Sequence, residues 1–292
     1  MNHGSLPAPV VDTEWLAAHL HDSDLLVLDV SIGLADDGPQ HVSMQEVYAS
    51  EHIPGAAYGD IVNELSELDS PFEITRPTID RATAAFGQLG IGSETKVVAY
   101  DSVTGACAAR LWWLLKSFGH DQVAMLDGGL QKWKSEGRPV EGGTTTPTPT
   151  IFVAHERPAM WAGKEQVSQV VREGKPATLV NAISHPSGDL IGLPADVVKL
   201  LTSMIPGSVS LPYPGLLEPG TATFRPDTEL KDELKIVPSG EHTIVYCGSA
   251  LGASMVALAL TAVGRTDVAV YDGSLAEWLA DPDAPIETNQ PF

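Results

Sequence analysis

The sequence predicts an α/β protein with two tandem domains, each a mainly parallel sheet flanked by helices. Three observations predict this class. Short motifs recur in the same order in both halves of the chain, apolar strand-like runs alternate with helical stretches in each half, and a Thr/Pro-rich segment separates the halves. Apolar strands that alternate with helices are typical of a parallel sheet covered on both faces.

Length and composition agree with two globular domains. The chain has 292 residues, of which 43% are hydrophobic and 19% are charged, so wholesale disorder is excluded. Its 17 Lys and Arg face 38 Asp and Glu, which gives a net charge of -21. This charge opposes binding to nucleic acid and to anionic membranes, so we expect neither as a partner. An anionic substrate would need a local positive feature to offset the charge.

Four landmarks recur in both halves, and such recurrence indicates a duplicated domain. The separation between matching landmarks shrinks slowly from 152 to 145 residues. The matching pairs are residues 28–30 with 180–182, His52-Ile53-Pro54-Gly55-Ala56 with Met204-Ile205-Pro206-Gly207-Ser208, residues 97–101 with 243–247, and residues 126–130 with 271–275. The expected first domain is 8–142, the linker is 143–160 and the second domain is 161–292. The linker alternates Thr and Pro and lacks an apolar period.

The expected elements follow the same order in both halves. In the first half, the strands are residues 25–30, 96–100 and 122–126, and the helices are 106–118 and 130–135. In the second half, the strands are 178–182, 242–246 and 267–271, and the helix is 253–263. The strand runs are short and largely apolar, whereas the helical runs are mostly longer.

Cys247 directly follows the expected strand 242–246, at the sheet edge where open α/β folds bind ligands. A turn of mostly small residues, Gly248-Ser249-Ala250-Leu251-Gly252, leads from it into a helix near Ala253. Such a turn directs successive backbone N–H groups into one concavity, and the helix N-terminus adds partial positive charge. We therefore expect a lowered pKa for the Cys247 thiol and stabilisation of a negatively charged persulfide.

Cys107 and Cys247 are the only cysteines, too few for a disulfide framework although one bridge stays open. Cys107 lies at an apolar position of the expected helix 106–118, which favours a role in the core. No cluster of His, Cys and carboxylates has metal-ligand spacing, so we expect neither a metal nor a cofactor. The N-terminus shows no signal-peptide pattern and no run is long enough to span a bilayer, so a cytoplasmic location is the expectation.

The chain resembles the rhodanese family in its tandem form, the thiosulfate and 3-mercaptopyruvate sulfurtransferases. The resemblance covers residues 10–278. Its motifs are His52-Ile53-Pro54-Gly55, Arg110-Leu111-Trp112-Trp113 with Phe118-Gly119-His120, Leu126-Asp127-Gly128-Gly129-Leu130, and Cys247-Gly248-Ser249. In the family the second domain carries the active cysteine and the first domain carries an aspartate there. Tyr246-Cys247 and Tyr100-Asp101 match this asymmetry, so the resemblance implies a catalytically silent first domain.

The resemblance implies a sulfurtransferase whose catalytic residue is Cys247. The donor would be thiosulfate, 3-mercaptopyruvate or another persulfide donor. The loop that would hold the sulfur consists of Gly248, Ser249, Ala250, Leu251, Gly252 and Ala253. Cyanide, a small thiol or a reduced protein thiol, such as a thioredoxin-like reductant, would accept the sulfur.

The sequence departs from the family where the donor would bind. The family motif Val-Asp-Ala-Arg corresponds to Val180-Asn181-Ala182-Ile183, and a nearby Arg-Phe-Arg-Gly corresponds to Asp189-Leu190-Ile191-Gly192. In the family those arginines grip the donor anion. Isoleucine stands at both positions here, as Ile183 and Ile191. The sequence leaves open whether the loss of the two arginines abolishes or redirects the activity. In the loop, Ala250 replaces the usual Gly and Gly252 replaces the usual Thr.

Two other functions compete with an active sulfurtransferase. A degenerate rhodanese would act as a sulfur carrier or as a binding or regulatory module with little turnover, and the two isoleucines and Ala250 favour it. A phosphatase of the rhodanese-related type would need an arginine six residues after the cysteine to clamp phosphate. That position is Ala253, which argues against a phosphatase.

Overall fold

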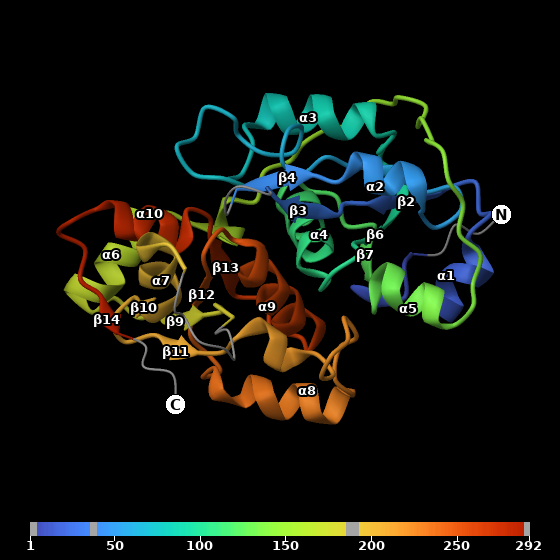
Figure 1. Cartoon of the computed structure of the whole chain (residues 1–292). Coiled ribbons are helices and arrows are strands. Elements are labelled where there is room, and N and C mark those ends of the chain that lie inside the picture. Colours follow the sequence, from blue (N-terminus) through green and yellow to red (C-terminus); the bar gives the residue numbers. More distant parts are fainter. Residues whose placement is uncertain (1–4, 36–39, 185–192, 289–292) are drawn as a thin grey trace. The chain divides into compact units, whose positions relative to one another are not determined.

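The computed structural model describes residues 5–35, 40–184 and 193–288. The chain divides into two compact units: Met1–Arg157 with Glu218–Phe224 form unit 1, and Pro158–Leu217 with Arg225–Phe292 form unit 2. Each unit contains a five-stranded parallel sheet flanked by helices (Figure 1), which confirms the predicted fold class. The boundaries at 8–142, 143–160 and 161–292 stay a prediction.

Unit 1 has the strand order β1-β7-β6-β2-β5. Its elements are β1 (Val10–Val11), α1 (Thr13–His19), β2 (Leu25–Asp29), β3 (Ile32–Leu34), β4 (His41–Ser43), α2 (Gln45–Ser50), β5 (Ala57–Tyr58), α3 (Ile79–Gln88), β6 (Lys96–Tyr100), α4 (Ala106–Ser117), β7 (Val123–Leu126) and α5 (Gly129–Ser135). Strands β3 and β4 form a separate antiparallel pair.

Unit 2 has the strand order β11-β9-β12-β13-β8. Its elements are β8 (Trp161–Ala162), α6 (Lys164–Glu173), β9 (Thr178–Asn181), α7 (Ala195–Thr202), β10 (Ser203–Met204), β11 (Val209–Ser210), a 3₁₀ turn (Tyr213–Leu216), α8 (Asp227–Glu233), β12 (Thr243–Tyr246), α9 (Leu251–Ala262), β13 (Val268–Tyr271), α10 (Ser274–Ala280) and β14 (Glu287–Thr288). Read from the opposite edge, this order is that of unit 1, as a duplication requires.

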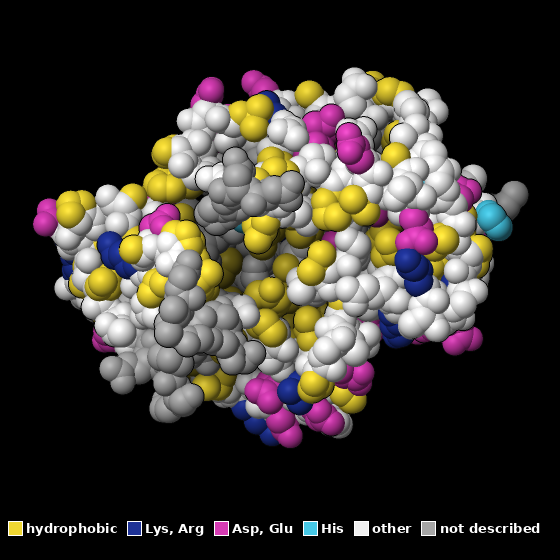
Figure 2. Space-filling view, viewed as in Figure 1, with side chains coloured by type: hydrophobic (Ala, Val, Ile, Leu, Met, Phe, Trp, Pro, Cys, Tyr) yellow, Lys and Arg dark blue, Asp and Glu magenta, His cyan; other side chains and the backbone are white. Residues whose placement is uncertain are grey.

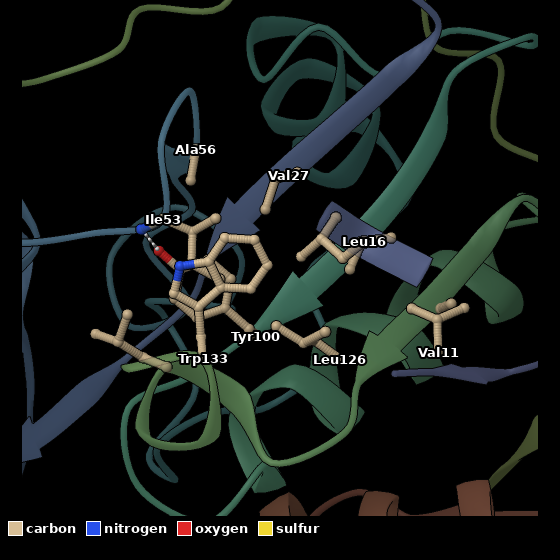
Figure 3. Packing of buried hydrophobic residues seen from close by; sticks show 11 residues of the cluster. Val11, Leu16, Val27, Ile53, Ala56, Tyr100, Leu126 and Trp133 are labelled. Atoms are coloured by element: carbon tan, nitrogen blue, oxygen red, sulfur yellow. Dashed lines mark hydrogen bonds between the residues drawn. The ribbon is translucent and has the colours of Figure 1, made fainter. Parts of the chain in front are cut away.

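One hydrophobic cluster of unit 1 shows how the sheet is covered (Figure 3). Leu16 of α1 and Trp133 of α5 pack with Val98 and Tyr100 of β6. Since side chains alternate along a strand, the intervening Ala99 points to the opposite face, and α4 also packs against β6. Burial of a large apolar side chain contributes about 1.5–3 kcal/mol, so both layers stabilise the sheet.

The observed elements lie close to the predicted ones. Strand β6 has the predicted bounds, and α4 ends one residue before the predicted end. The helix after Cys247 begins at Leu251, two residues earlier than predicted, because Ala250 already takes the N-cap position. The sequence did not predict that Glu218–Phe224 belongs to unit 1, where the N–H of Phe224 donates to Oδ1 of Asp127 at 2.8 Å.

Candidate active site

Cys247 lies at the carboxyl end of β12, the central strand of the unit 2 sheet, and is 5% exposed. Its carbonyl accepts a hydrogen bond from the N–H of Leu275 at 2.9 Å. Its own N–H donates to Oγ of Ser274 at 3.2 Å. The first turn of α10 therefore holds the backbone of Cys247 on both sides.

The backbone N–H groups of Ser249, Ala250, Gly252 and Ala253 lie close enough to the sulfur of Cys247 to lower its pKa. They belong to the turn after β12 and the first turn of α9. The structure thus brings four of the six predicted loop residues to the sulfur through their amides. Gly248 and Leu251 connect these donors, and the carbonyl of Gly248 accepts the N–H of Ala276 at 3.3 Å. We call the four donors the amide cradle.

Burial raises the pKa of the Cys247 thiol, and the four N–H groups of the cradle lower it. Burial has the larger effect, so the pKa lies above its ordinary value and the predicted lowering is wrong. The sequence indicated the amides correctly. It did not show how completely the surrounding elements exclude water from the sulfur, and exclusion of water disfavours the thiolate.

Ala250 has a positive φ of 65°, in the left-handed region that L-residues avoid. The conformation aims the N–H of this residue at the sulfur while α9 begins. For a residue with a Cβ atom it costs about 1 kcal/mol relative to glycine. The structure therefore explains why the family prefers glycine at this position.

Residues 181–183 lie beside the cradle, since the carbonyl of Ala182 would lie 3.4 Å from a methyl group added to Gly252. Ile183 is 4% exposed, and its N–H donates to Oδ1 of Asn181 at 3.0 Å. Asn181 is fully buried, and its Nδ2 has no hydrogen-bond partner among the described residues. Ile191, the other predicted departure, lies outside the described residues. Acidic side chains are spread over the face seen in Figure 2, in keeping with the net charge of -21.

Unit 1 holds a carboxylate at the corresponding place. Oδ1 of Asp101 accepts the N–H groups of Val103, Thr104 and Gly105 at 2.9–3.0 Å. Oδ2 accepts those of Cys107 and Ala108 at 3.0 and 3.2 Å. Cys107 is 8% exposed, and burial together with the carboxylate of Asp101 raises its pKa well above the ordinary value. Its contacts fit the predicted role in the core.

Sequence reasoning missed Ser274, which is fully buried and has a positive φ of 51°. Its hydroxyl donates to the carbonyl of Tyr271 at 2.9 Å while it accepts the N–H of Cys247. A signal was available, because the repeat aligns Ser274 with Gly129, whose φ is 52°. A non-glycine residue at a left-handed position next to a candidate nucleophile is the kind of strain found at functional sites.

Comparison with known proteins identifies the family to which the chain is similar. The rhodanese-like domain family matches residues 12–136 and 198–281. Thiosulfate/3-mercaptopyruvate sulfurtransferase 2 of Arabidopsis thaliana is 33% identical over 95% of this chain and 86% of its own length. Thiosulfate sulfurtransferase of Bos taurus is 34% identical over 95% of this chain and 94% of its own. A crystal structure of a 3-mercaptopyruvate sulfotransferase from Escherichia coli superposes with a TM-score of 0.77 and is 26% identical, over 91% of this chain and 98% of its own.

The chain therefore belongs to the rhodanese family of sulfurtransferases, as the motifs predicted. Its relatives imply a sulfur donor and a sulfur acceptor as substrates. Within residues 5–35, 40–184 and 193–288, no helix is long and apolar enough to cross a membrane, and no group of three or more His, Cys, Asp and Glu could hold a metal ion. The cytoplasmic location stays a prediction.

Proposed function

We propose that Cys247 is the nucleophile that carries the sulfur, and that Ser249, Ala250, Gly252 and Ala253 stabilise the negative charge on it. The amide cradle is the observation that carries this proposal. Gly248 and Leu251 complete the loop and set the spacing of the donors. Unit 1 would be catalytically silent, because Asp101 fills its cradle with a carboxylate that cannot bind a sulfane sulfur.

The transfer would proceed in two half-reactions. The Cys247 thiolate attacks the sulfane sulfur of the donor, a new S–S bond forms at Cys247, and the bond between that sulfur and its carrier breaks. With thiosulfate the leaving group is sulfite. An acceptor such as cyanide or a thiol then attacks the outer sulfur, breaks the S–S bond and regenerates the thiolate. A thioredoxin-like reductant is one acceptor of the required chemistry.

The cradle would act on the charge that moves between the two sulfur atoms. Hydrogen bonds to charged groups contribute about 1.5–3 kcal/mol each, and their effect increases where water is excluded. The N–H groups are held by α9 and the turn before it, so they need little rearrangement during the reaction. They do not keep the resting thiol ionised, however, because burial raises its pKa. The proton must leave before or during the attack.

Thiosulfate and 3-mercaptopyruvate should be weak donors. Ile183 stands where the family has an arginine, and a charge-assisted grip on an anion contributes about 1.5–3 kcal/mol. Its loss should lower kcat/KM by about ten- to a hundredfold per arginine. The decisive comparison is wild type against Ile183→Arg with mercaptopyruvate. A rise in kcat/KM supports the missing grip, whereas ordinary efficiency in the wild type contradicts it.

The proposal is tested by incubating the protein with thiosulfate, 3-mercaptopyruvate and small persulfides, and by reading persulfidation from the intact mass. Cys247→Ser should abolish persulfide formation and sulfur transfer with every donor. Cys107→Ser is the matched control, and it should retain most of the activity. Persulfidation without multiple turnover would favour the alternative, a degenerate rhodanese that carries sulfur or serves as a binding module. Full activity in the Cys247→Ser variant would refute the role of Cys247.

A further inference from the structure

Two side chains from other parts of unit 2 lie against the glycines of the Cys247 loop. A methyl group added to Gly248 would lie 3.3 Å from Cδ2 of Leu200, a residue of α7. A methyl group added to Gly252 would lie 2.6 Å from Cδ1 of Tyr213, so a side chain there would require the tyrosine ring to shift. The ring of Tyr213 thus occupies the space that the family's threonine would need. We call Leu200 and Tyr213 the apolar rim.

Backbone contacts hold the Tyr213 side of the rim next to the cradle. The N–H of Tyr213 donates to the carbonyl of Ala182 at 3.2 Å. The same carbonyl would lie 3.4 Å from a methyl group on Gly252. The next residue, Ile183, is buried and apolar. Leu200 and Tyr213 are each partly exposed, so both can meet a molecule that reaches the sulfur.

Most cations of unit 2 have carboxylate or carbonyl partners, and one of them, Arg225, binds the carbonyl of Gly215 in the same 3₁₀ turn as Tyr213. Their partners are Asp281 for Lys164, the carbonyl of Asp283 for Arg172, Glu173 for Lys175, Glu229 and the carbonyl of Gly215 for Arg225, Asp232 for Lys235, and the carbonyls of Val237 and Pro238 for Arg265. Residues 185–192, outside the described part, contain neither Lys nor Arg. Of the two remaining lysines, Lys199 and Lys231, only Lys199 neighbours the rim, through Leu200.

We infer that the donor at Cys247 is an organic hydropersulfide with an uncharged, apolar carrier group, which Leu200 and Tyr213 contact. This inference rests on the proposed function. The Cys247 thiolate attacks the outer sulfur of the donor R–S–SH. The products are the thiolate R–S⁻ and the persulfide Cys247–S–SH. One S–S bond forms, one breaks, and no net oxidation occurs. The proton lost by the Cys247 thiol ends on the leaving thiolate.

Charge and burial both favour this donor class. A dianion such as thiosulfate brings charge to a loop whose glycines lie against the uncharged side chains of Leu200 and Tyr213, on a protein with net charge -21. An uncharged carrier brings no such charge, and the charge that develops on sulfur lies within the amide cradle. Contact with a leucine and a tyrosine ring stabilises an apolar carrier by removing its surface from water.

The test compares benzyl hydropersulfide, thiosulfate and mercaptopyruvate by the initial rate of Cys247 persulfide formation, read from intact mass and corrected with Cys247→Ser. Benzyl hydropersulfide should exceed either anion at least about tenfold in kcat/KM, the equivalent of one large favourable contact. Leu200→Ala and Tyr213→Ala should each lower its kcat/KM about tenfold, mainly through KM, with thiosulfate changed less than about twofold.

Leu201→Ala is the matched control, since Leu201 is also on α7 and half-buried but contributes no contact to Gly248 in the described structure. It should leave the donor preference unchanged, and thermal unfolding checks that each variant folds. A preference for thiosulfate or mercaptopyruvate overturns the inference. If Lys199→Met then abolishes that preference, Lys199 is the residue that binds the anionic donor. An unchanged preference in both rim variants also overturns it. No persulfide with any donor would overturn the proposed function itself.

Discussion

The loop that follows β6 in unit 1 and the loop that follows β12 in unit 2 present nearly the same set of amides to different groups. The N–H groups of Thr104, Gly105, Cys107 and Ala108 bind the carboxylate of Asp101. Shifted by 145 residues, they correspond to Ser249, Ala250, Gly252 and Ala253, which bind the sulfur of Cys247. The strand-to-helix turn therefore builds an anion site in both units, and the residue at the strand end decides what the site holds.

The two loops differ by one residue. The strands before them are related by 146 residues, but the helices after them by 145, so the loop of unit 1 is longer. The extra residue lets Val103 donate a fifth hydrogen bond to the carboxylate. A carboxylate has two oxygens and accommodates these five donors, whereas Cys247 offers a single sulfur atom. The shorter loop suits one sulfur atom.

Removal of the anion from unit 1 should give the largest effect on stability. Asp101→Ala leaves five buried or half-buried N–H groups without their acceptor, and each orphaned group costs about 1–3 kcal/mol unless water reaches it. We expect a loss of at least about 3 kcal/mol in the free energy of unfolding. Urea unfolding followed by tryptophan fluorescence measures it. Cys247→Ala should lower the free energy of unfolding less than Asp101→Ala does. An equal loss would show that the sulfur and the carboxylate stabilise their loops to the same extent.

The reactivity of Cys247 should rise with pH. Because burial raises its pKa, the thiolate is the minor form at neutral pH, and alkylation by iodoacetamide should accelerate about tenfold per pH unit beyond the ordinary value of ~8.5. Circular dichroism at each pH controls for unfolding. A rate that is flat above about pH 7 would mean that the cradle outweighs burial.

Cys107 should react more slowly than Cys247 at every pH. Burial and the negative charges of Asp101 and Asp29 raise its pKa well above the ordinary value, and the backbone N–H of Ile32 opposes them only in part. Mass-spectrometric mapping of alkylated peptides at one pH would separate the two sites. Equal rates would indicate that exposure, and not electrostatics, controls both thiols. Asp101→Asn removes the negative charge near Cys107, so it should narrow the difference between the alkylation rates of Cys107 and Cys247.

Exchange of the left-handed residues should give the smallest effect. Ala250→Gly removes the strain of a positive φ and should stabilise unit 2 by about 1 kcal/mol. Gly105, with φ 83°, is the corresponding position in unit 1, so Gly105→Ala should destabilise unit 1 by about the same amount. Thermal unfolding of both variants provides the comparison. A destabilising Ala250→Gly would show that the Ala250 methyl group contributes more through packing than it costs in strain.

Sequence patterns predicted the long central elements better than the edges. Strands β6 and β12 and helix α4 were visible because each is an apolar run with clear ends. The edge strands β1, β5, β8 and β11 were not predicted. Each has two residues, too few to show any period, and exists only because a neighbouring strand supplies hydrogen bonds.

The candidate site divides in the same way. The repeat, the asymmetry between Asp101 and Cys247 and the small-residue turn were all legible in the chain, since each depends on residues close together or on a direct match between the halves. They determined the fold class, the family and the position of the candidate nucleophile. The structure decided the direction of the Cys247 pKa shift, the apolar rim of Leu200 and Tyr213, and the place of Glu218–Phe224 in unit 1. These depend on burial and contact between segments far apart in the chain, which no local pattern encodes.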